Sequence, residues 1–267
     1  MSRIEVDTIL PQSGTSLTLG SSGDTVTIPS GVSLAPGGGL TLTGNFVVDG
    51  GTIKLDGNYP TGTENVALGD TALDSVEAGG TNNTVIGSKA GTAITTGDFN
   101  TAVGLCSQHS VTTAGSNVSI GANSLRDNVT GTSNTALGHA ALLVNTASNN
   151  TAAGWLSLSA NTSGACNTAD GVCTLAANQT GANLTAIGMH ALKLNTESDN
   201  TAIGRDSMCT NSTGQSNTAV GVNSLKANTT GSQNIVMGQA ALDANTTGSC
   251  NTAIGRSALG ANTTASN

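Results

Sequence analysis

The three histidines are the side chains of this chain best suited to metal binding and proton transfer. Metal sites need several His, Cys or carboxylate ligands at short, recurring spacings. His109, His139 and His190 instead occupy three different places in the repeat described below, and no cysteine or carboxylate pattern with ligand spacing surrounds them. The sequence therefore predicts no metal site and no cofactor, and it indicates that the histidines lie in surface turns.

The cysteines could form disulfides if their spacing in the repeat allowed it. Cys166 and Cys250 share one place in the repeat five coils apart, and Cys106 and Cys173 share another place four coils apart. At about 4.8 Å per coil these pairs lie about 19–24 Å apart, well beyond the limit of about 7 Å between the Cα atoms of a disulfide. We therefore expect free thiols that act as small apolar side chains, in keeping with synthesis in the cytoplasm.

Catalysis is not indicated, because the carboxylates lack recurring partners. Enzymes that cleave glycans use paired acids, whereas the acidic residues here are scattered over turns, so we predict no catalytic residues and no enzyme. Asp170 is the one carboxylate at a position predicted to point inward, directly above the small Ala153. It is either a buried ligand for an unidentified group or a packing defect, filled by Trp155 or opened to water. The sequence favours the packing defect.

The composition excludes a thick globular core and several classes of partner. Only 1% of the residues are aromatic and 9% are charged, and the net charge is −8 without a basic cluster. Aromatic side chains bury much of a large core, and basic patches mark nucleic-acid or anionic membrane binding. The chain start has no apolar signal segment, and no apolar run approaches the roughly 20 residues of a membrane helix. We therefore expect a soluble product made in the cytoplasm, without nucleic acid and without membrane insertion.

A pentad of the form Asn134-Thr-Ala-Leu-Gly138 recurs from residue 65 to the end of the chain. Successive pentad glycines are 17 residues apart in eight intervals, 16 in two and 18 in one. They are Gly69, Gly87, Gly104, Gly121, Gly138, Gly154, Gly171, Gly188, Gly204, Gly221, Gly238 and Gly255. Such a period is typical of a solenoid, in which each coil buries its apolar residues only by stacking on the next. Helix is the competing prediction, but Gly, Thr and Asn at this density disfavour it.

Alignment of the coils on this glycine defines three columns within the pentad. The threonine column, three residues before the glycine, is β-branched in all twelve coils and is Thr in nine. The alanine column, two before, is Ala in nine coils, and the aliphatic column, one before, is Leu, Ile, Val or Met in ten, with Ala153 and Asp170 as exceptions. Alternate strand residues share a face. We therefore expect the threonine and aliphatic columns to point inward, and the alanine column to form a surface packed closely by a neighbour.

Two further columns follow the glycine. The leucine column, four residues after it, is Leu or Met in ten of twelve coils, and it predicts the inward residue of a second short strand such as Asn223-Ser-Leu-Lys-Ala227. The asparagine column, seven after, is Asn in nine successive coils from Asn128 to Asn262, which predicts a ladder of stacked amides. Gly and Asn are expected to supply positive φ where the chain reverses. Twelve coils at about 4.8 Å each form a rod about 55–60 Å long.

The first sixty residues lack this period. They contain short apolar-x-apolar pairs such as Leu17/Leu19 and Phe46/Val48, separated by Gly, Ser and Pro turns. Six short strands are too little core for an independent domain of this size. We therefore divide the chain into a β-rich attachment or capping region, residues 1–60, and a β-roll repeat shaft, residues 61–267. Either several chains intertwine in the first region or it docks on another protein, with Arg3-Ile-Glu-Val-Asp7 as a docking peptide.

Residues 2–35, with Ile4-Glu-Val-Asp-Thr-Ile9 and the stretch from Leu17 to Gly31, resemble the starts of tail-fibre and virion structural proteins of marine phages, especially phages of cyanobacteria. The repeats over residues 65–267 resemble fibre repeats of such phages, and they are similar to the head of trimeric autotransporter adhesins, which has an Ala-Ile-Gly core pentad. The resemblance implies a parallel, left-handed β-roll and a homotrimer. It also implies a place on the virion, outside the host cell, after synthesis in the host cytoplasm.

Three hypotheses for function are open. The first is a homotrimeric fibre shaft, attached to a virion protein through residues 1–60 and projecting a distal part, outside this chain, that binds a host surface receptor. The second is an adhesin whose β-roll itself binds a host glycan or protein, although sugar sites usually need more aromatic residues than this chain has. The third is an ice-binding solenoid, since Thr fills eight of twelve places in each of the columns eight and nine after the glycine. Those two columns are adjacent and face opposite sides of a strand, so they form no flat array.

The carboxyl-terminal coil is as regular as the others and ends on Asn262-Thr-Thr-Ala-Ser-Asn267, which matches a turn after which a new pentad begins. Natural repeat proteins close their ends with atypical polar caps. We expect that this chain belongs to a longer fibre or that another protein covers this end, and the gene sequence beyond the codon for Asn267 decides between them.

Overall fold

A computed structural model describes residues 64–266 of the chain, and its regular structure consists of twelve short β-strands. Each strand is three residues long and occupies the threonine, alanine and aliphatic columns of one coil. The strands are β1 (Val66–Leu68), β2 (Thr84–Ile86), β3 (Thr101–Val103), β4 (Val118–Ile120), β5 (Thr135–Leu137), β6 (Thr151–Ala153), β7 (Thr168–Asp170), β8 (Thr185–Ile187), β9 (Thr201–Ile203), β10 (Thr218–Val220), β11 (Ile235–Met237) and β12 (Thr252–Ile254). The predictions for residues 1–60, including the boundary at residue 60, lie outside the described residues.

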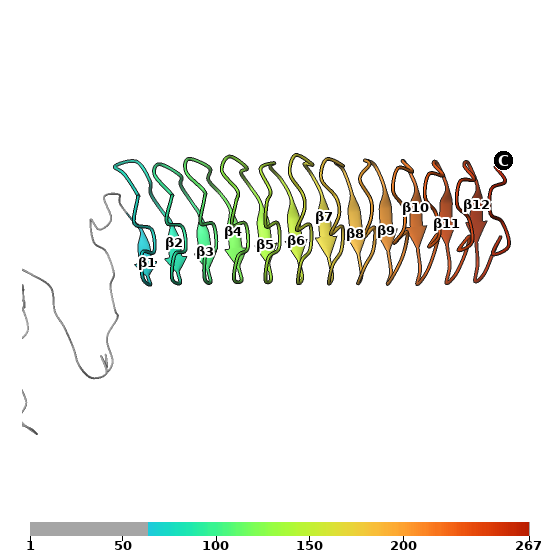
Figure 1. Cartoon of the computed structure of the whole chain (residues 1–267), viewed down its shortest axis with the longest axis horizontal. Helices are drawn as coiled ribbons and strands as arrows, with labels where there is room; N and C mark the ends of the chain where they lie inside the picture. The colour runs from blue at the N-terminus through green and yellow to red at the C-terminus, as the bar shows by residue number, and fades with distance from the viewer. Residues whose placement is uncertain (1–63, 267) are drawn as a thin grey trace, which may run out of the picture. The chain divides into compact units, whose positions relative to one another are not determined.

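The strands form one parallel sheet in chain order, from β1 to β12 (Figure 1). Each strand pairs with the same three columns of the next coil, so that Thr201, Ala202 and Ile203 lie opposite Thr218, Ala219 and Val220. The register is kept across the shorter coils, where Ala136 still pairs with Ala152. The predicted all-β parallel solenoid with a repeat of about 17 residues is therefore confirmed.

The faces of the strands are the reverse of those predicted. The alanine column is buried, with Ala136, Ala202 and Ala219 all at 0% exposure, whereas Ile203 in the aliphatic column is 37% exposed. The alternation along the strand was predicted correctly, but its phase was wrong. The reason is the thinness of the coil, because the strand and the turn that faces it leave room inside only for a small side chain, most often Ala, opposite a leucine.

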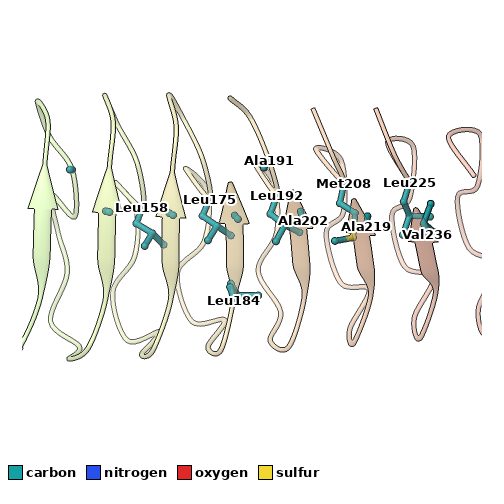
Figure 2. Packing of buried hydrophobic residues seen from close by; sticks show 14 of the residues in the cluster. Leu158, Leu175, Leu184, Ala191, Leu192, Ala202, Met208, Ala219, Leu225 and Val236 are labelled. Carbon is teal, nitrogen blue, oxygen red and sulfur yellow. The ribbon is translucent and has the colours of Figure 1, made fainter. Parts of the chain in front are cut away.

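The leucine column fills the interior opposite the alanine column. Leu192 and Leu225 are fully buried, as predicted, and Figure 2 shows them reaching from the turns toward the strands that carry Ala202 and Val236. Small residues on the strand and large ones on the turn thus form a narrow apolar core that continues from coil to coil. This narrow core stabilises the solenoid without the aromatic side chains that fill larger cores.

The predicted second strand is absent from the described coils, and a left-handed turn takes its place. Within Asn223-Ser-Leu-Lys-Ala227, Asn223 has φ of 58° and Leu225 has φ of 49°. Non-glycine residues rarely adopt this region because the Cβ atom approaches a backbone carbonyl. Here the conformation turns the leucine inward and lets its N–H donate to the carbonyl of Ala241 in the next coil at 2.9 Å. Side-chain burial and this bond offset the cost of the turn.

Two asparagine ladders run through the interior. The predicted ladder in the asparagine column is confirmed in part, since Asn228 Nδ2 donates to Asn211 Oδ1 at 2.7 Å and Asn245 Nδ2 donates to Asn228 Oδ1 at 2.9 Å. It is interrupted at the two shorter coils, where Asn145 and Asn195 donate to carbonyls of their own turns. A second ladder, which was not predicted, is formed by the first residue of each pentad. In it the N–H and Nδ2 of Asn234 both donate to Asn217 Oδ1 at 3.0 Å. Both ladders are buried, so each amide replaces hydrogen bonds that water would otherwise make.

The asparagines of the asparagine column serve hydrogen bonding and not positive φ, contrary to the prediction. Asn128 Nδ2 donates to the Gly131 carbonyl at 2.8 Å and Asn128 Oδ1 accepts from the Gly131 N–H at 3.0 Å, which closes the turn. Positive φ occurs instead at the residue before each pentad, such as Ser216 at 55°. The prediction for the pentad glycine is confirmed, since Gly204 has φ of 130°. A Cβ atom there would also lie 2.6 Å from the backbone of Gly221 in the next coil.

Candidate interaction face

The outer face of the sheet carries a line of exposed aliphatic side chains. Eight members of the aliphatic column are large and exposed, at 37–67%: Leu68, Ile86, Ile120, Leu137, Ile187, Ile203, Met237 and Ile254. Beside them runs the threonine column, which is half-buried or exposed along the whole sheet. Soluble monomers rarely expose a continuous apolar patch of more than a few hundred square ångströms. This outer face, made of the threonine and aliphatic columns, is the clearest candidate site in the described part of the chain.

The dimensions of the outer face suit a contact between macromolecules. Twelve coils at about 4.8 Å give a length of about 55 Å, and three residues at about 3.3 Å give a width of about 10 Å. The resulting area, of the order of 550 Å², approaches the roughly 800 Å² that each partner commonly contributes to a stable interface.

Two neighbouring coils interrupt the aliphatic column. Ala153 and Asp170 pair with each other across β6 and β7, and each replaces a large apolar residue. Asp170 is exposed on the outer face, so the prediction that it points inward is wrong, and it is neither a buried ligand nor a defect in the core of the coil. The side chain that stands next to this interruption is Trp155, which is 50% exposed.

Trp155 belongs to a further column, formed by the residue after each pentad glycine, which we call the post-glycine column. Within it Trp155, Val172 and Met189 are exposed at 50%, 40% and 41%. The three lie in successive coils, since the Trp155 carbonyl accepts from Cys173 N–H at 2.9 Å and the Val172 carbonyl accepts from His190 N–H at 3.0 Å. An apolar row thus runs beside the gap in the aliphatic column.

The histidines lie in turns, as predicted, and do not come together. His139 is exposed, and His109 and His190 are half-buried in different coils. His190 Nδ1 lies 3.2 Å from Asp206 Oδ1, the closest pairing of a histidine with a carboxylate in residues 64–266. Among these residues no group of three His, Cys, Asp or Glu side chains could hold a metal ion.

The cysteine thiols are all free: Cys106, Cys166, Cys173, Cys209 and Cys250. Cys166 and Cys250 are exposed and the other three are half-buried. Burial raises the pKa of the Cys209 thiol, with a smaller contribution from nearby Asp206. Because the thiolate is the reactive form, the environment of Cys209 lowers its reactivity.

A buried polar layer divides the core between the third and fourth coils. The Ser107 hydroxyl contacts the hydroxyls of Ser119 and Ser124, and Gln108 replaces the leucine of its column. Gln108 Nε2 donates to the carbonyls of Thr101 at 3.0 Å and Asn117 at 3.2 Å, while its Oε1 is buried without a partner. The apolar core is accordingly split into two clusters on either side of this layer. The exceptions in the leucine and alanine columns were the sequence signal that could have located it.

Comparisons with known proteins add no relatives: no protein-family model, no curated protein and no solved structure matches this chain. In the described residues, no helix has the length and apolar character needed to span a membrane.

Proposed function

We propose that this chain is a structural shaft of a tailed-phage fibre, in which copies of the solenoid pack side by side through the outer face. The observation that carries the proposal is the line of exposed aliphatic side chains along the sheet. Water contact with this line is unfavourable, at about 25 cal/mol per Å² of apolar surface, and packing against identical faces removes it. Self-association thus uses the aliphatic column, and not the alanine column that the sequence suggested.

The assembly we propose is a parallel homotrimer, and its supports are the resemblance of residues 65–267 to phage fibre repeats and to trimeric adhesin heads. A closed cyclic arrangement covers all three faces around one axis and leaves none for uncontrolled growth. Residues 1–60 bind a virion protein in this proposal, and a distal part outside this chain binds the host surface receptor. The protein is then located in the virion, outside the host cell.

Sedimentation equilibrium of the full chain at micromolar concentration tests the proposal. We expect a species of three times the chain mass of 26.0 kDa. A double substitution in the outer face, Ile187→Asp with Ile203→Asp, should yield monomers whose far-UV circular dichroism is unchanged. The matched control is Thr180→Asp, which places a charge on an exposed turn and should leave the trimer intact. A folded, stable monomer of the unaltered chain contradicts the proposal, and absence of the chain from purified virions contradicts its place in the particle.

A second function, ice binding, is favoured by one observation that the sequence did not predict. The nine Thr residues of the threonine column face outward from one parallel sheet, in register from coil to coil. Regular threonine arrays on a flat surface suit ordered water. Thermal hysteresis of the full chain distinguishes the two functions, since a fibre shaft produces none.

A further inference from the structure

Three irregularities of the solenoid coincide in two adjacent coils. Ala153 is the one small residue of the aliphatic column, Asp170 is its one charged residue, and Trp155 is the only tryptophan of the chain. Ala153 and Asp170 are register partners in β6 and β7. Trp155 follows Ala153 by two residues, so their Cα atoms lie within about 7 Å of each other. A break in the line of large aliphatic side chains, which we call the gap, therefore lies close to a large exposed ring.

We propose that Trp155 of one copy occupies the gap above Ala153 in the neighbouring copy, where its indole N–H donates a hydrogen bond to the Asp170 carboxylate. This inference rests on the self-association described under the proposed function and names the residues that anchor it. In a parallel assembly in register, the ring and the gap of every copy lie in the same layer. Each copy gives one ring and receives one, an arrangement that closes in a cyclic assembly.

The proposed contact would cover the exposed ring of Trp155 and give the Asp170 carboxylate a hydrogen-bond donor. A tryptophan that is 50% exposed keeps a large apolar surface in water until it is covered. Asp170 lies in an otherwise apolar column, and a carboxylate that is covered there needs a donor, because burial without a hydrogen bond is costly. The indole N–H is a donor without an acceptor function, so it satisfies the carboxylate without introducing a second charge.

The pairing also sets the register between copies. Sliding one copy by a single coil toward β5 would place Trp155 against Leu137 and leave Asp170 without its donor. Sliding it toward β7 would place the ring level with Asp170, away from the small Ala153. A single polar position in an apolar interface is known to fix register in coiled coils. In this solenoid Asp170 and Trp155 together act in that way, since the other positions of the aliphatic column are nearly equivalent.

The fluorescence of the full chain tests the inference directly, because Trp155 is its only tryptophan. In the assembled state we expect a blue-shifted emission maximum and weak quenching by acrylamide. In the monomeric Ile187→Asp, Ile203→Asp variant we expect the emission and quenching of an exposed indole. Assembled chains in which Trp155 remains fully open to acrylamide overturn this inference and leave the proposed assembly standing. An unaltered chain that stays monomeric overturns both.

Substitutions of Trp155, which we call the anchor of the interface, provide the second measurement. Trp155→Ala should raise the dissociation constant of the assembly at least about tenfold, as for an interface hot spot. Trp155→Phe keeps a ring but lacks the N–H, so a smaller rise of about three- to tenfold is expected. The matched control is Leu105→Ala, which shortens another exposed side chain of the post-glycine column, 52% exposed, beside the regular Val103. Equal effects of Trp155→Ala and Leu105→Ala contradict the anchor.

Register is measured by cross-linking of a cysteine introduced for Thr168 in a chain whose five cysteines are replaced by Ala. Bonds between equivalent residues of two copies are expected for the unaltered anchor. With Asp170→Leu, cross-linking should spread to shifted pairs. Assemblies mixed from Thr168→Cys chains and Thr185→Cys or Thr151→Cys chains report them, because two such cysteines in one chain would be neighbours in the sheet and bridge each other. Retention of a single register in the Asp170→Leu variant contradicts the role of Asp170.

Discussion

The inner and outer faces of each strand differ in a way that hydrophobicity alone does not indicate. Within β9, Ala202 is completely buried, while the larger and more apolar Ile203 is 37% exposed. In a thick domain the larger side chain would be the core residue. In this solenoid the leucine of the facing turn fills most of the interior, so the strand contributes a small side chain, Ala in nine of twelve coils, and the larger residues remain on the outside.

The room available inside the coil, and not the polarity of the side chains, thus decides which face of the strand points inward. The inner face is determined by a single coil and its two neighbours, because the interior is closed by stacking alone. Within the described part of one chain, no neighbouring coil covers the outer face in this way. Its aliphatic residues are understood only if something covers them, which is the basis of the proposed assembly.

The largest expected loss of stability comes from placing a charge on the inner face. The same substitution at two adjacent residues compares the two faces. Ala202→Asp places a charge in the core without a partner, which costs several kcal/mol or more, so thermal unfolding should occur far below that of the unaltered chain. Ile203→Asp puts the charge in water, and the monomer should lose less than about 1 kcal/mol. Chemical denaturation followed by circular dichroism measures both. If Ile203→Asp destabilises the monomer as much as Ala202→Asp, the assignment of the faces is wrong.

The second effect concerns the glycine where the strand ends. Gly204→Ala combines a disfavoured φ of 130° with a Cβ atom 2.6 Å from the next coil, and we expect a loss above about 2 kcal/mol. Gly255→Ala is the matched control, because Gly255 has φ of 118° but no atom within 4 Å of an added Cβ. The difference between the two variants in denaturation free energy isolates the contact between coils, and equal losses contradict it.

The third effect is the removal of one amide from a buried ladder. Asn217→Ala leaves the Asn234 N–H without its acceptor, which lies at 3.0 Å. It also removes one of the two donors to the Gly231 carbonyl, at 2.9 Å, while Asn228 Nδ2 remains at 2.8 Å. Unsatisfied buried groups of this kind cost about 1–3 kcal/mol. Thr213→Ala, at an exposed position, is the control and should change stability by less than about 0.5 kcal/mol. If Asn217→Ala loses no more stability than the control, water has replaced the hydrogen bonds of the ladder, and the prediction is wrong.

Several features of the fold could be predicted from the sequence because they depend on period. The intervals between glycines gave the coil length, and the recurring Asn128 to Asn262 gave one ladder. The second ladder was equally visible, with Asn at the start of eleven of the twelve pentads and Leu184 in the other, but it was treated as part of the strand. An asparagine in this place can point inward only if the next coil supplies hydrogen-bond partners for its amide. Whether the next coil does so depends on tertiary geometry, which the sequence does not show.

Other features could not be predicted because they depend on shape. Leu225 adopts φ of 49°, a conformation that Leu seldom takes in isolation, so the pattern of apolar residues indicated a strand where the chain turns. The phase of the alternation depends on the width of the interior, which no single column reveals. The candidate outer face was missed for the same reason, since its residues were assigned to the core.

The smallest expected effect is that of an ion pair on the outside, in contrast to the polar contacts within. Arg126 Nη2 lies 2.7 Å from Asp127 Oδ2, and both side chains are 39% exposed. The hydrogen bond from Arg126 holds the pKa of Asp127 below the ordinary 3.8, so the pair stabilises the folded chain above the unfolded pKa. That contribution is lost as the pH falls through the lower, folded pKa. Solvent screening limits it to less than about 0.5 kcal/mol. Denaturation of the unaltered chain and of Asp127→Asn, at pH 7 and again below the folded pKa of Asp127, should therefore differ slightly at pH 7 and converge in acid. A difference at pH 7 as large as that of Asn217→Ala would show that surface and interior polar contacts contribute equally.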